Sequence, residues 1–181
     1  MIIGVDARVF QEREPTGVTR YAHFFIEELG RRYPKARFAL FISGIRPFTA
    51  PEFSPELSGR ITWYRLKIPH LILNIGFLIF RFPKLDLWFG KKINSQLDLL
   101  VIPNLHFVAI SRKAKVLLVV HDLSFVHEPR WFSWKSRLWH WLVLRQHLWP
   151  RANLLVSVSQ ITACDLEKTV GINFVQVIIT A

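Results

Sequence analysis

Cysteine is nearly absent from this chain of 181 residues, in which Cys164 is the only one. An internal disulfide needs two cysteines and a thiolate metal cage needs several, so the sequence excludes both. An unpaired cysteine usually behaves as a small apolar side chain, and we expect Cys164 to pack in that way.

Long apolar runs are also missing. The longest apolar stretch, residues 71–80, is interrupted by Asn74 and Gly76 and has about half the length that a bilayer span requires. The chain begins MIIGV, which predicts a strand, and Asp6 and Arg8 follow at once, so no secretory signal is expected. These absences predict a cytoplasmic protein that does not span a membrane. A peripheral contact with the inner face of the membrane remains an open alternative.

Acidic residues are scarce: 13 of them face 24 lysines and arginines, which gives a formal net charge of +11. Hydrophobic residues make up 51% of the chain and aromatic residues 14%, whereas a disordered basic tail would be poor in both. The composition therefore indicates a folded basic protein. Partners that carry negative charge are favoured, namely phosphates, anionic lipid or nucleic acid.

The order of apolar segments predicts an α/β fold with a Rossmann-like parallel sheet and helices on both faces, formed by residues 1–181 as a single domain. Runs such as VLLVV at 116–120 lack polar alternation, which is typical of interior parallel strands. The predicted strands are residues 2–6, 37–43, 61–66, 98–102, 116–120, 154–158 and 174–179. The predicted helices are 18–32, two short helices within 69–94 broken at Phe82-Pro83, about 133–148, and 160–170 with Gly171 at its end.

Two places in this pattern are candidates for chemistry. His121 and Asp122 directly follow a buried strand, and ligands of open parallel sheets collect beyond the carboxyl ends of the strands. The loop QEREPTG joins the first strand to the first helix, and the free amides at a helix start favour an anion. This loop has one glycine where a dinucleotide fingerprint has three. An ordinary closing loop and a structural histidine are the alternative interpretations.

Two aromatic segments suggest surface contacts. On the helix at 133–148, Trp134, Leu138, Trp141, Leu142 and Leu148 fall on one side, which predicts that this side packs on the core. Trp139 and Val143 fall away from it, near Lys135, Gln146 and His147, which predicts a partly exposed patch that contacts lipid or a partner domain. Within 69–94, cations alternate with aromatic residues, as at membrane surfaces and equally on ordinary surface helices.

Four stretches together resemble the N-terminal domain of a GT-B glycosyltransferase of family 4. They are IIGVDARVFQEREPTGVTRYAHFFIEEL, the pair PNLHF and VLLVVHDLSFVHEPRWFS, then RANLLVSVSQITACDLEKTVGI, and the closing VQVII. The combination of D-A-R with T-G-V-x-R-Y, H-D-L-S-F and V-S-x-x-T-x-x-D-L carries the resemblance, which covers nearly the whole chain in the expected order.

In such enzymes two Rossmann-like domains face each other across a cleft, and the N-terminal one mainly shapes the acceptor site. The resemblance implies that Thr16 and Gly17 approach the donor diphosphate through their backbone amides. It implies that His121 contacts the donor sugar near the reacting centre and that Asp122 orients the same loop. Many relatives have a second glycine where Thr19 stands here.

Other matched residues have simpler interpretations. Arg8 and Arg20 are interpreted as surface cations and Ser159 as a helix cap. His127 and Glu128 could join His121 and Asp122 as metal ligands, but the resemblance implies a fold class that works without a bound metal. We therefore expect no metal and no cofactor, with a nucleotide-sugar donor as substrate.

The departure from the family is large, because the chain ends at Ala181, about where the domain linker of the relatives begins. We therefore expect the C-terminal donor-binding domain to be absent, with its E-x7-E glutamates and basic residues that hold the donor. Charge on the leaving group needs positioned cations or dipoles, so the isolated chain should bind donor weakly and turn over little or nothing. A missing lobe or a separate chain would then be a partner.

The resulting hypothesis is the acceptor-side half of a retaining glycosyltransferase. It would move a hexose, with mannose as the candidate, from a nucleotide-sugar to a lipid or polysaccharide acceptor such as a cell-envelope polysaccharide. The alternative is a non-catalytic basic module that binds nucleic acid or anionic membrane, which would require a continuous basic face. No recognised nucleic-acid motif is visible in the sequence, which makes nucleic acid the less favoured partner.

Overall fold

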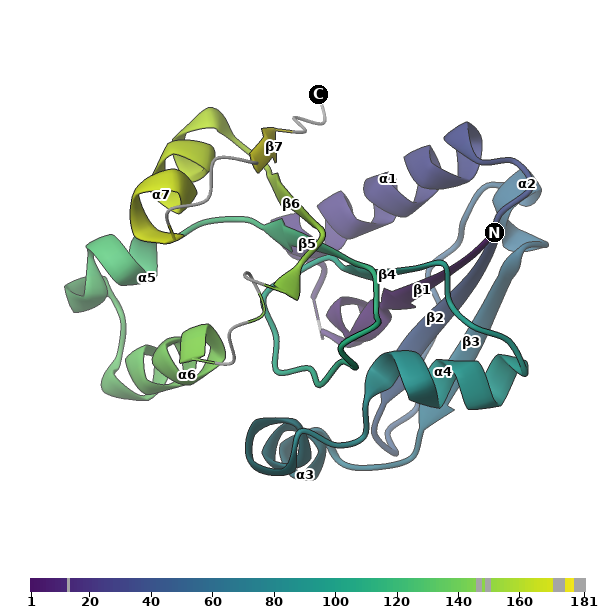
Figure 1. Cartoon of the computed structure of the whole chain (residues 1–181), viewed down its shortest axis with the longest axis horizontal. Coiled ribbons are helices and arrows are strands. Elements are labelled where there is room, and N and C mark those ends of the chain that lie inside the picture. Colours follow the sequence, from purple (N-terminus) through teal and green to yellow (C-terminus); the bar gives the residue numbers. More distant parts are fainter. Residues whose placement is uncertain (13, 146–147, 149–150, 171–174, 178–181) are drawn as a thin grey trace.

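Seven parallel strands form one sheet in the computed structural model, in the order β3-β2-β1-β4-β5-β6-β7 (Figure 1). The structure describes all residues except 13, 146–147, 149–150, 171–174 and 178–181. The strands are β1 (Ile2–Asp6), β2 (Arg37–Ser43), β3 (Ile61–Leu66), β4 (Leu99–Ile102), β5 (Val116–Val120), β6 (Leu154–Ser157) and β7 (Val175–Val177). The predicted Rossmann-like parallel sheet is confirmed, and the ends of its last predicted strand, at 174 and 178–179, lie outside the described residues.

Helices and short turns connect the strands. They are η1 (Ala7–Gln11), α1 (Gly17–Arg32), α2 (Pro55–Ser58), α3 (His70–Ile75), the π-helical η2 (Gly76–Phe80), α4 (Leu85–Ile93), α5 (Ser124–His127), η3 (Pro129–Trp131), α6 (Trp134–Arg145) and α7 (Gln160–Val170). The predicted break at Phe82-Pro83 falls between η2 and α4. Ser159 accepts a hydrogen bond from the Thr162 amide (3.1 Å), which confirms it as the cap of α7. The predicted Gly171 end lies outside the described residues. No helix of the described ranges is both long and apolar enough to cross a bilayer.

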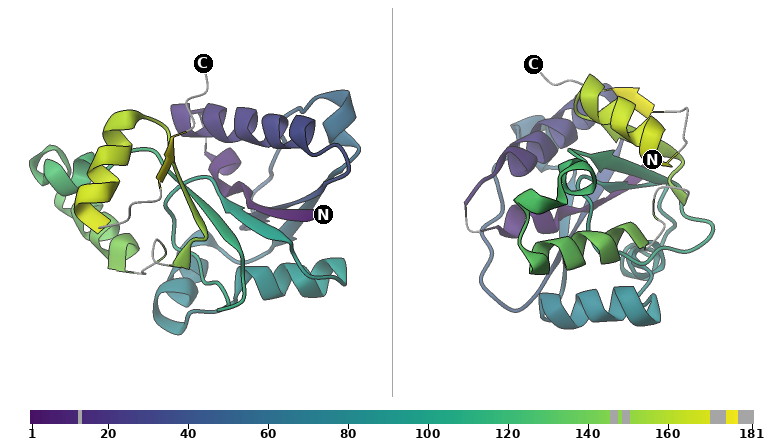
Figure 2. Two further views of the ribbon diagram at one scale, coloured as in Figure 1. Left: turned by 45° about the horizontal axis from the view of Figure 1, so that its top comes forward. Right: turned by 90° about the vertical axis from the view of Figure 1, so that its left-hand side faces the viewer.

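The core has two layers because strand side chains alternate between the two faces of the sheet. On β2, Phe38 and Leu40 pack with α1 and α2, while Ala39 and Phe41 pack on the opposite side with α3, η2 and α4. Val143 of α6 joins that second cluster. Figure 2 shows α1 on one side of the sheet and α4 on the other. Right-handed crossovers that run to both sides from the centre of the sheet produce this arrangement.

The strand order reverses between β1 and β4. The chain leaves β1 toward β2 and β3 on one side, and leaves β4 toward β5, β6 and β7 on the other. Connections on the two sides diverge at such a switch point, so a crevice opens beyond the carboxyl ends of the two strands. The ends of β1 and β4 therefore define the place where this fold holds a ligand.

The prediction for the exposed face of α6 was wrong for most of its residues. Trp134, Leu138 and Trp141, which were expected to pack, are exposed, and Val143, which was expected to lie away from the core, is 3% exposed. Leu142 packs on the core as predicted, and Trp139 is partly buried against it. The helical wheel was oriented partly by Leu148, but α6 ends at Arg145, so Leu148 reaches the core from outside the helix. Gln146 and His147 of the predicted patch lie outside the described residues.

Cys164 is also exposed rather than packed. It lies on α7 directly after two buried residues, Thr162 and Ala163. Its position on the helix therefore directs it to the surface, whatever its affinity for an apolar environment.

Candidate functional site

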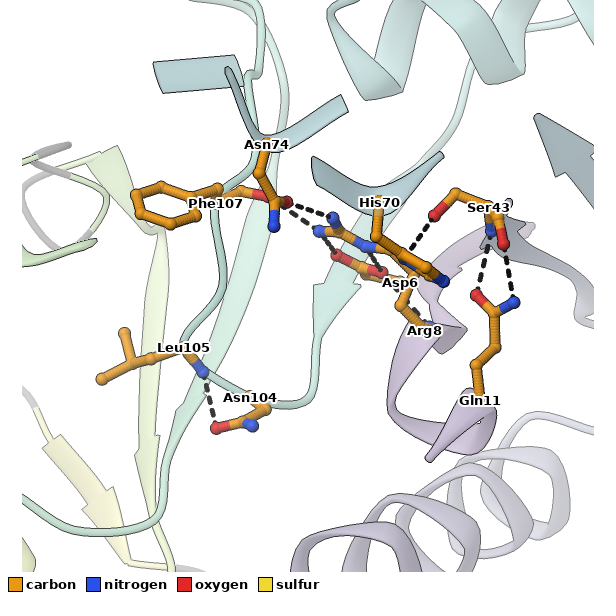
Figure 3. Close-up of polar contacts among 9 residues, drawn as sticks. All are labelled: Asp6, Arg8, Gln11, Ser43, His70, Asn74, Asn104, Leu105 and Phe107. Atoms are coloured by element: carbon orange, nitrogen blue, oxygen red, sulfur yellow. Dashed lines mark hydrogen bonds and ion pairs between the residues drawn. The ribbon is translucent and has the colours of Figure 1, made fainter. Parts of the chain in front are cut away.

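Arg8 lies at the centre of the crevice at the switch point, in the cluster that Figure 3 shows. Its Nη2 donates to Asp6 Oδ2 (2.6 Å) and to the Phe107 carbonyl (2.8 Å), and its Nε donates to Asp6 Oδ1 (2.8 Å). Its Nη1 donates to Asn74 Oδ1 (3.4 Å). One guanidinium therefore connects β1, α3 and the loop after β4.

The prediction of Arg8 as a surface cation was wrong, since its side chain is 5% exposed and that of Asp6 is 2% exposed. The turn η1 begins directly after Asp6, which accepts from the Arg8 amide and folds the arginine back over the strand end. The rings of Phe41 and Phe77 cover the guanidinium at 5.7 and 5.3 Å. Burial alone would raise the pKa of Asp6, but the charge and hydrogen bonds of Arg8 hold that pKa below its usual value.

A cavity of about 290 Å³ lies beside α2 and the amino end of β3, whereas a smaller one of about 180 Å³ opens beside Arg8. Gln11, Glu12, His70, Asn74 and His106 line the smaller cavity together with Arg8. Every lining side chain carries a hydrogen-bonding group, so the cavity suits a small polar ligand with several hydroxyl groups.

His70 is held at the cavity by the end of β2. Its Nδ1 lies 3.0 Å from the Ser43 hydroxyl, and Gln11 binds the Ser43 backbone carbonyl (2.7 Å) and amide (3.0 Å) (Figure 3). Gly44 follows with a φ of +91°, and a Cβ there would lie 3.2 Å from His70 Nε2. A residue with a side chain would therefore be strained and would crowd the imidazole.

The two histidines of the cavity are neutral at ordinary pH. Burial lowers the pKa of His106 to about 4, and the positive charge of Arg8 adds to the effect. Burial lowers the pKa of His70 as well, again helped by Arg8. Neutral imidazoles offer one donor and one acceptor each, which suits sugar hydroxyls better than phosphate.

The start of α1 lies at the same carboxyl edge. Thr16 caps the helix: its hydroxyl accepts from the Thr19 amide (3.4 Å), and the Thr19 hydroxyl accepts from the Thr16 amide (3.3 Å). Gly17 is exposed, with open space where a Cβ would lie. The threonine at 19 thus completes a capping box. Glu12 accepts from the Thr16 hydroxyl (3.0 Å), so a carboxylate now stands where an anionic ligand would come.

His121 follows β5 and turns toward the loop after β4. Its Nε2 lies 2.9 Å from the Pro103 carbonyl, which can only accept, so Nε2 carries the proton and Nδ1 is left as an acceptor. Burial lowers the pKa of His121, although the Pro103 carbonyl and Asp122 oppose this. Asp122 is exposed and accepts from the Ser124 amide (3.1 Å) and hydroxyl (2.6 Å), so it fixes the turn into α5.

Tyr21 links the two predicted places. Its ring meets the His121 ring edge to face at 5.1 Å and stacks on Phe25 at 5.8 Å. It stands one turn into α1 from Gly17, so the start of α1 and His121 share one edge of the sheet. The Tyr21 hydroxyl is buried and, among the described side chains, has no hydrogen-bond partner. Burial raises its pKa.

The other candidates take no part in this contact, and none of them has metal geometry within the described residues. Arg20 is exposed, as predicted. His127 pairs with Asp165 of α7 at 3.5 Å instead of joining His121. Within the part of the chain that the structure describes, no three His, Cys, Asp or Glu side chains are grouped as metal ligands.

Sequence reasoning missed the Arg8 cluster and its cavity. The signal that was present is the pair D-x-R directly after a buried strand, because a carboxylate two residues before an arginine can pair with it in a tight turn. The remaining members, Asn74 and His106, come from distant segments, and no local pattern connects them.

Comparison with known proteins adds the fold relationship. No family model and no curated protein sequence matches the chain. Among solved structures, it is similar to a UGT transferase from Siraitia grosvenorii, crystallised in complex with UDP, with a TM-score of 0.58 and 10% identity. The match covers 99% of this chain and 50% of that one, so the chain spans half the length of this neighbour. At this identity the likeness is one of fold, and the chain has a glycosyltransferase-like Rossmann fold.

Proposed function

We propose that the chain is the acceptor-side half of a retaining glycosyltransferase of the GT-B type, similar to family 4. It takes part in moving a hexose from a nucleotide-sugar to a lipid or polysaccharide acceptor. The observation that carries the proposal is the common edge shared by the start of α1 and His121, which Tyr21 connects. The similarity to a transferase solved with UDP supports a nucleotide-sugar as the ligand.

On the donor side, the amides at the start of α1 face the diphosphate and His121 faces the sugar. The free Nδ1 of neutral His121 accepts a hydrogen bond from a sugar hydroxyl, and its Nε2 stays bound to Pro103. Asp122 takes no proton in this scheme and acts through the turn that it holds. Glu12 must turn away from the helix start when a diphosphate arrives, because two negative groups there repel each other.

On the acceptor side, the cavity beside Arg8 receives hydroxyl groups. His70, Asn74 and His106 offer neutral hydrogen-bonding groups there, and Arg8 has its charge balanced by Asp6. The carboxylate of Glu12 also lines the cavity and repels anions, so this wall favours a glycan end over a phosphate. Donor and acceptor then approach each other along the carboxyl edge, between β1 and β5.

Half a transferase holds the donor from one side only. We expect the isolated chain to bind nucleotide-sugar weakly and to turn over little, and a second lobe or chain to supply the missing contacts. The identity of the donor sugar, of the acceptor and of the linkage depends on that second part as much as on this chain.

Titration of the ¹⁵N-labelled chain with UDP-glucose and GDP-mannose tests the proposal. Amide shifts at Gly17, Thr19 and His121 are expected at ligand concentrations of about a millimolar or more, consistent with a half-site. The variant His121→Ala should weaken sugar-dependent shifts but keep those caused by UDP alone. If neither nucleotide-sugar moves these resonances, or if only surface cations respond, the proposal is refuted.

The second candidate is a non-catalytic basic module for nucleic acid or anionic membrane. One observation favours it: five exposed cations line the same cavity, namely Lys84, Lys91, Arg112, Lys113 and Lys115. This candidate would be supported instead by a salt-dependent affinity for duplex DNA, together with unchanged amide shifts of Gly17 and His121 in the titration above.

A further inference from the structure

Cations gather around two adjoining cavities beside η2 and α4. One has a volume of about 490 Å³ and the other about 880 Å³, and both are lined by Lys84 and Arg112. The larger one lies at the amino ends of β4 and β5, whereas the crevice lies at their carboxyl ends. We call the two cavities the basic groove, after its exposed cations Arg81, Lys84, Lys91, Arg112, Lys113 and Lys115.

The positive charge of the basic groove is not balanced. None of its six cations forms an ion pair with a carboxylate of the described residues. Among the described residues, Asp86 is the only acidic side chain that lines either cavity, and it accepts from the Ser111 amide (2.8 Å). Arg151 donates to the carbonyls of Ile110 (3.1 Å) and Ser111 (2.8 Å). The loop that carries three of the cations is thus anchored, and the positive charges are held close together.

An apolar surface adjoins this charge. The segment from α3 to Phe82 buries Leu73 and Phe77 and exposes large apolar side chains on its other side. Two of these side chains, Leu71 and Phe80, are each 72% exposed. We call this surface the apolar ridge, and it consists of Leu71, Ile72, Ile75, Ile79, Phe80 and Phe82.

The π-helical turn of η2 lengthens the apolar ridge. A π-helix has more residues per turn than an α-helix, so the chain rotates less from one residue to the next. Ile79 and Phe80 therefore stay on the same side as Ile75, while Phe77 remains buried. Phe77 and Leu78, from the same turn, line the smaller cavity of the groove. Ridge and groove are therefore contiguous parts of one face, near α3 and α4 in Figure 1.

We infer that this face binds an anionic phospholipid membrane, with lipid phosphates in the basic groove and the apolar ridge in the boundary between headgroups and acyl chains. Unpaired cations beside exposed aliphatic side chains are the combination that such an interface accommodates. Nucleic acid fits less well, because four of the six ridge side chains, Leu71, Ile72, Ile75 and Ile79, are aliphatic and cannot stack on bases. The inference deepens the membrane alternative of the second candidate function, and it stands whether or not the chain transfers sugar.

Binding to lipid vesicles measures the contributions of the basic groove and of the apolar ridge separately. The intact chain is sedimented with phosphatidylcholine vesicles that contain about 30% phosphatidylglycerol and with vesicles of phosphatidylcholine alone, at low and high salt. We expect strong binding to the anionic vesicles, weakened by salt. A cation near an anionic surface contributes roughly fivefold in partitioning, so Lys84→Gln, Arg112→Gln and Lys113→Gln together should lower binding roughly 100-fold.

The matched control removes three exposed cations elsewhere, with Lys35→Gln, Arg37→Gln and Lys168→Gln, and should change binding only a few fold. The ridge variant Ile72→Ser with Ile79→Ser changes exposed side chains and keeps the fold, and it should lower vesicle binding roughly 10-fold or more. Equal losses in the groove variant and the control would overturn the inference. So would an unchanged ridge variant, or duplex DNA that binds more tightly than the vesicles.

Discussion

Replacement of Arg8 by Met gives the sharpest test of the candidate crevice. The change removes the positive charge that faces Asp6 and leaves a carboxylate that is 2% exposed without its counterion. Removing one partner of a buried ion pair typically costs about 3–5 kcal/mol. Two further hydrogen bonds disappear, to the Phe107 carbonyl and to Asn74, at about 1 kcal/mol each. Contact of Met with Phe41 and Phe77 offsets part of this, so we expect a net loss of about 4 kcal/mol.

The pH dependence identifies the cause of that loss. In the wild-type chain the pKa of Asp6 lies below its ordinary value of 3.8, so the contribution of the pair is present above that pH and is lost below it. In Arg8→Met, the guanidinium no longer opposes burial, which raises the pKa of Asp6. The cost of the unpaired carboxylate is then complete at neutral pH and decreases as pH falls through the raised pKa. The difference in unfolding free energy between variant and wild type should therefore shrink from about pH 7 to about pH 5.

Urea denaturation followed by tryptophan fluorescence measures these free energies. The matched control is the double variant Asp6→Asn with Arg8→Met, which removes both charges. We expect it to lie within about 2 kcal/mol of the wild type, because only the two outer hydrogen bonds stay broken. If the single and double variants are equally destabilised, or if the single variant shows the same loss at both pH values, the pair does not organise the crevice and the reasoning fails.

The remaining predictions concern individual groups of the site. Tyr21→Phe removes a hydroxyl that has no partner in the described chain, so urea denaturation should show stability unchanged or raised by up to about 1 kcal/mol. Gly44→Ala places a side chain at a φ of +91° against His70 and should cost about 1–3 kcal/mol, whereas Gly59→Ala, with open space and a φ of −67°, should be neutral or slightly stabilising. Proton NMR should find the pKa of His106 near 4. Because His106 binds its proton at a higher pH in the unfolded chain than in the folded one, the free energy of unfolding should fall as pH drops from about 6.5 toward 4. Glu12→Gln removes the carboxylate at the start of α1 and should raise UDP affinity about two- to fivefold in a titration, an outcome that an unchanged affinity would contradict.

Much of the fold was predictable because interior parallel strands have a strong local signature. The uninterrupted runs at β4 and β5 predicted buried strands, and the order of elements predicted the sheet. The edge that holds His121 and the start of α1 followed from parallel topology alone. The face of α6 did not, because a wheel of mixed tryptophans and leucines gives no dominant direction, and the core contact depends on where the chain leaves the helix.

The Arg8 cluster shows why site residues are harder to predict than strands. A charged residue after a strand is most often at the surface, and burial becomes favourable only when several partners surround it. Here those partners come from β1, from α3 and from the loop after β4, which are far apart in the sequence. The local sequence therefore indicates the first partner, Asp6, but does not predict the others.

The net charge of the chain and its proposed sugar chemistry belong to different surfaces. At the crevice, Arg8 is neutralised by Asp6 and the histidines are neutral, so little positive charge is left there to attract a phosphate. The exposed cations of the basic groove lie away from that edge and are unpaired within the described chain. A basic composition therefore does not argue for nucleotide binding in this protein. Because the groove acts through exposed charges and the crevice through buried hydrogen bonds, added salt should weaken contact with a membrane much more than contact with a sugar.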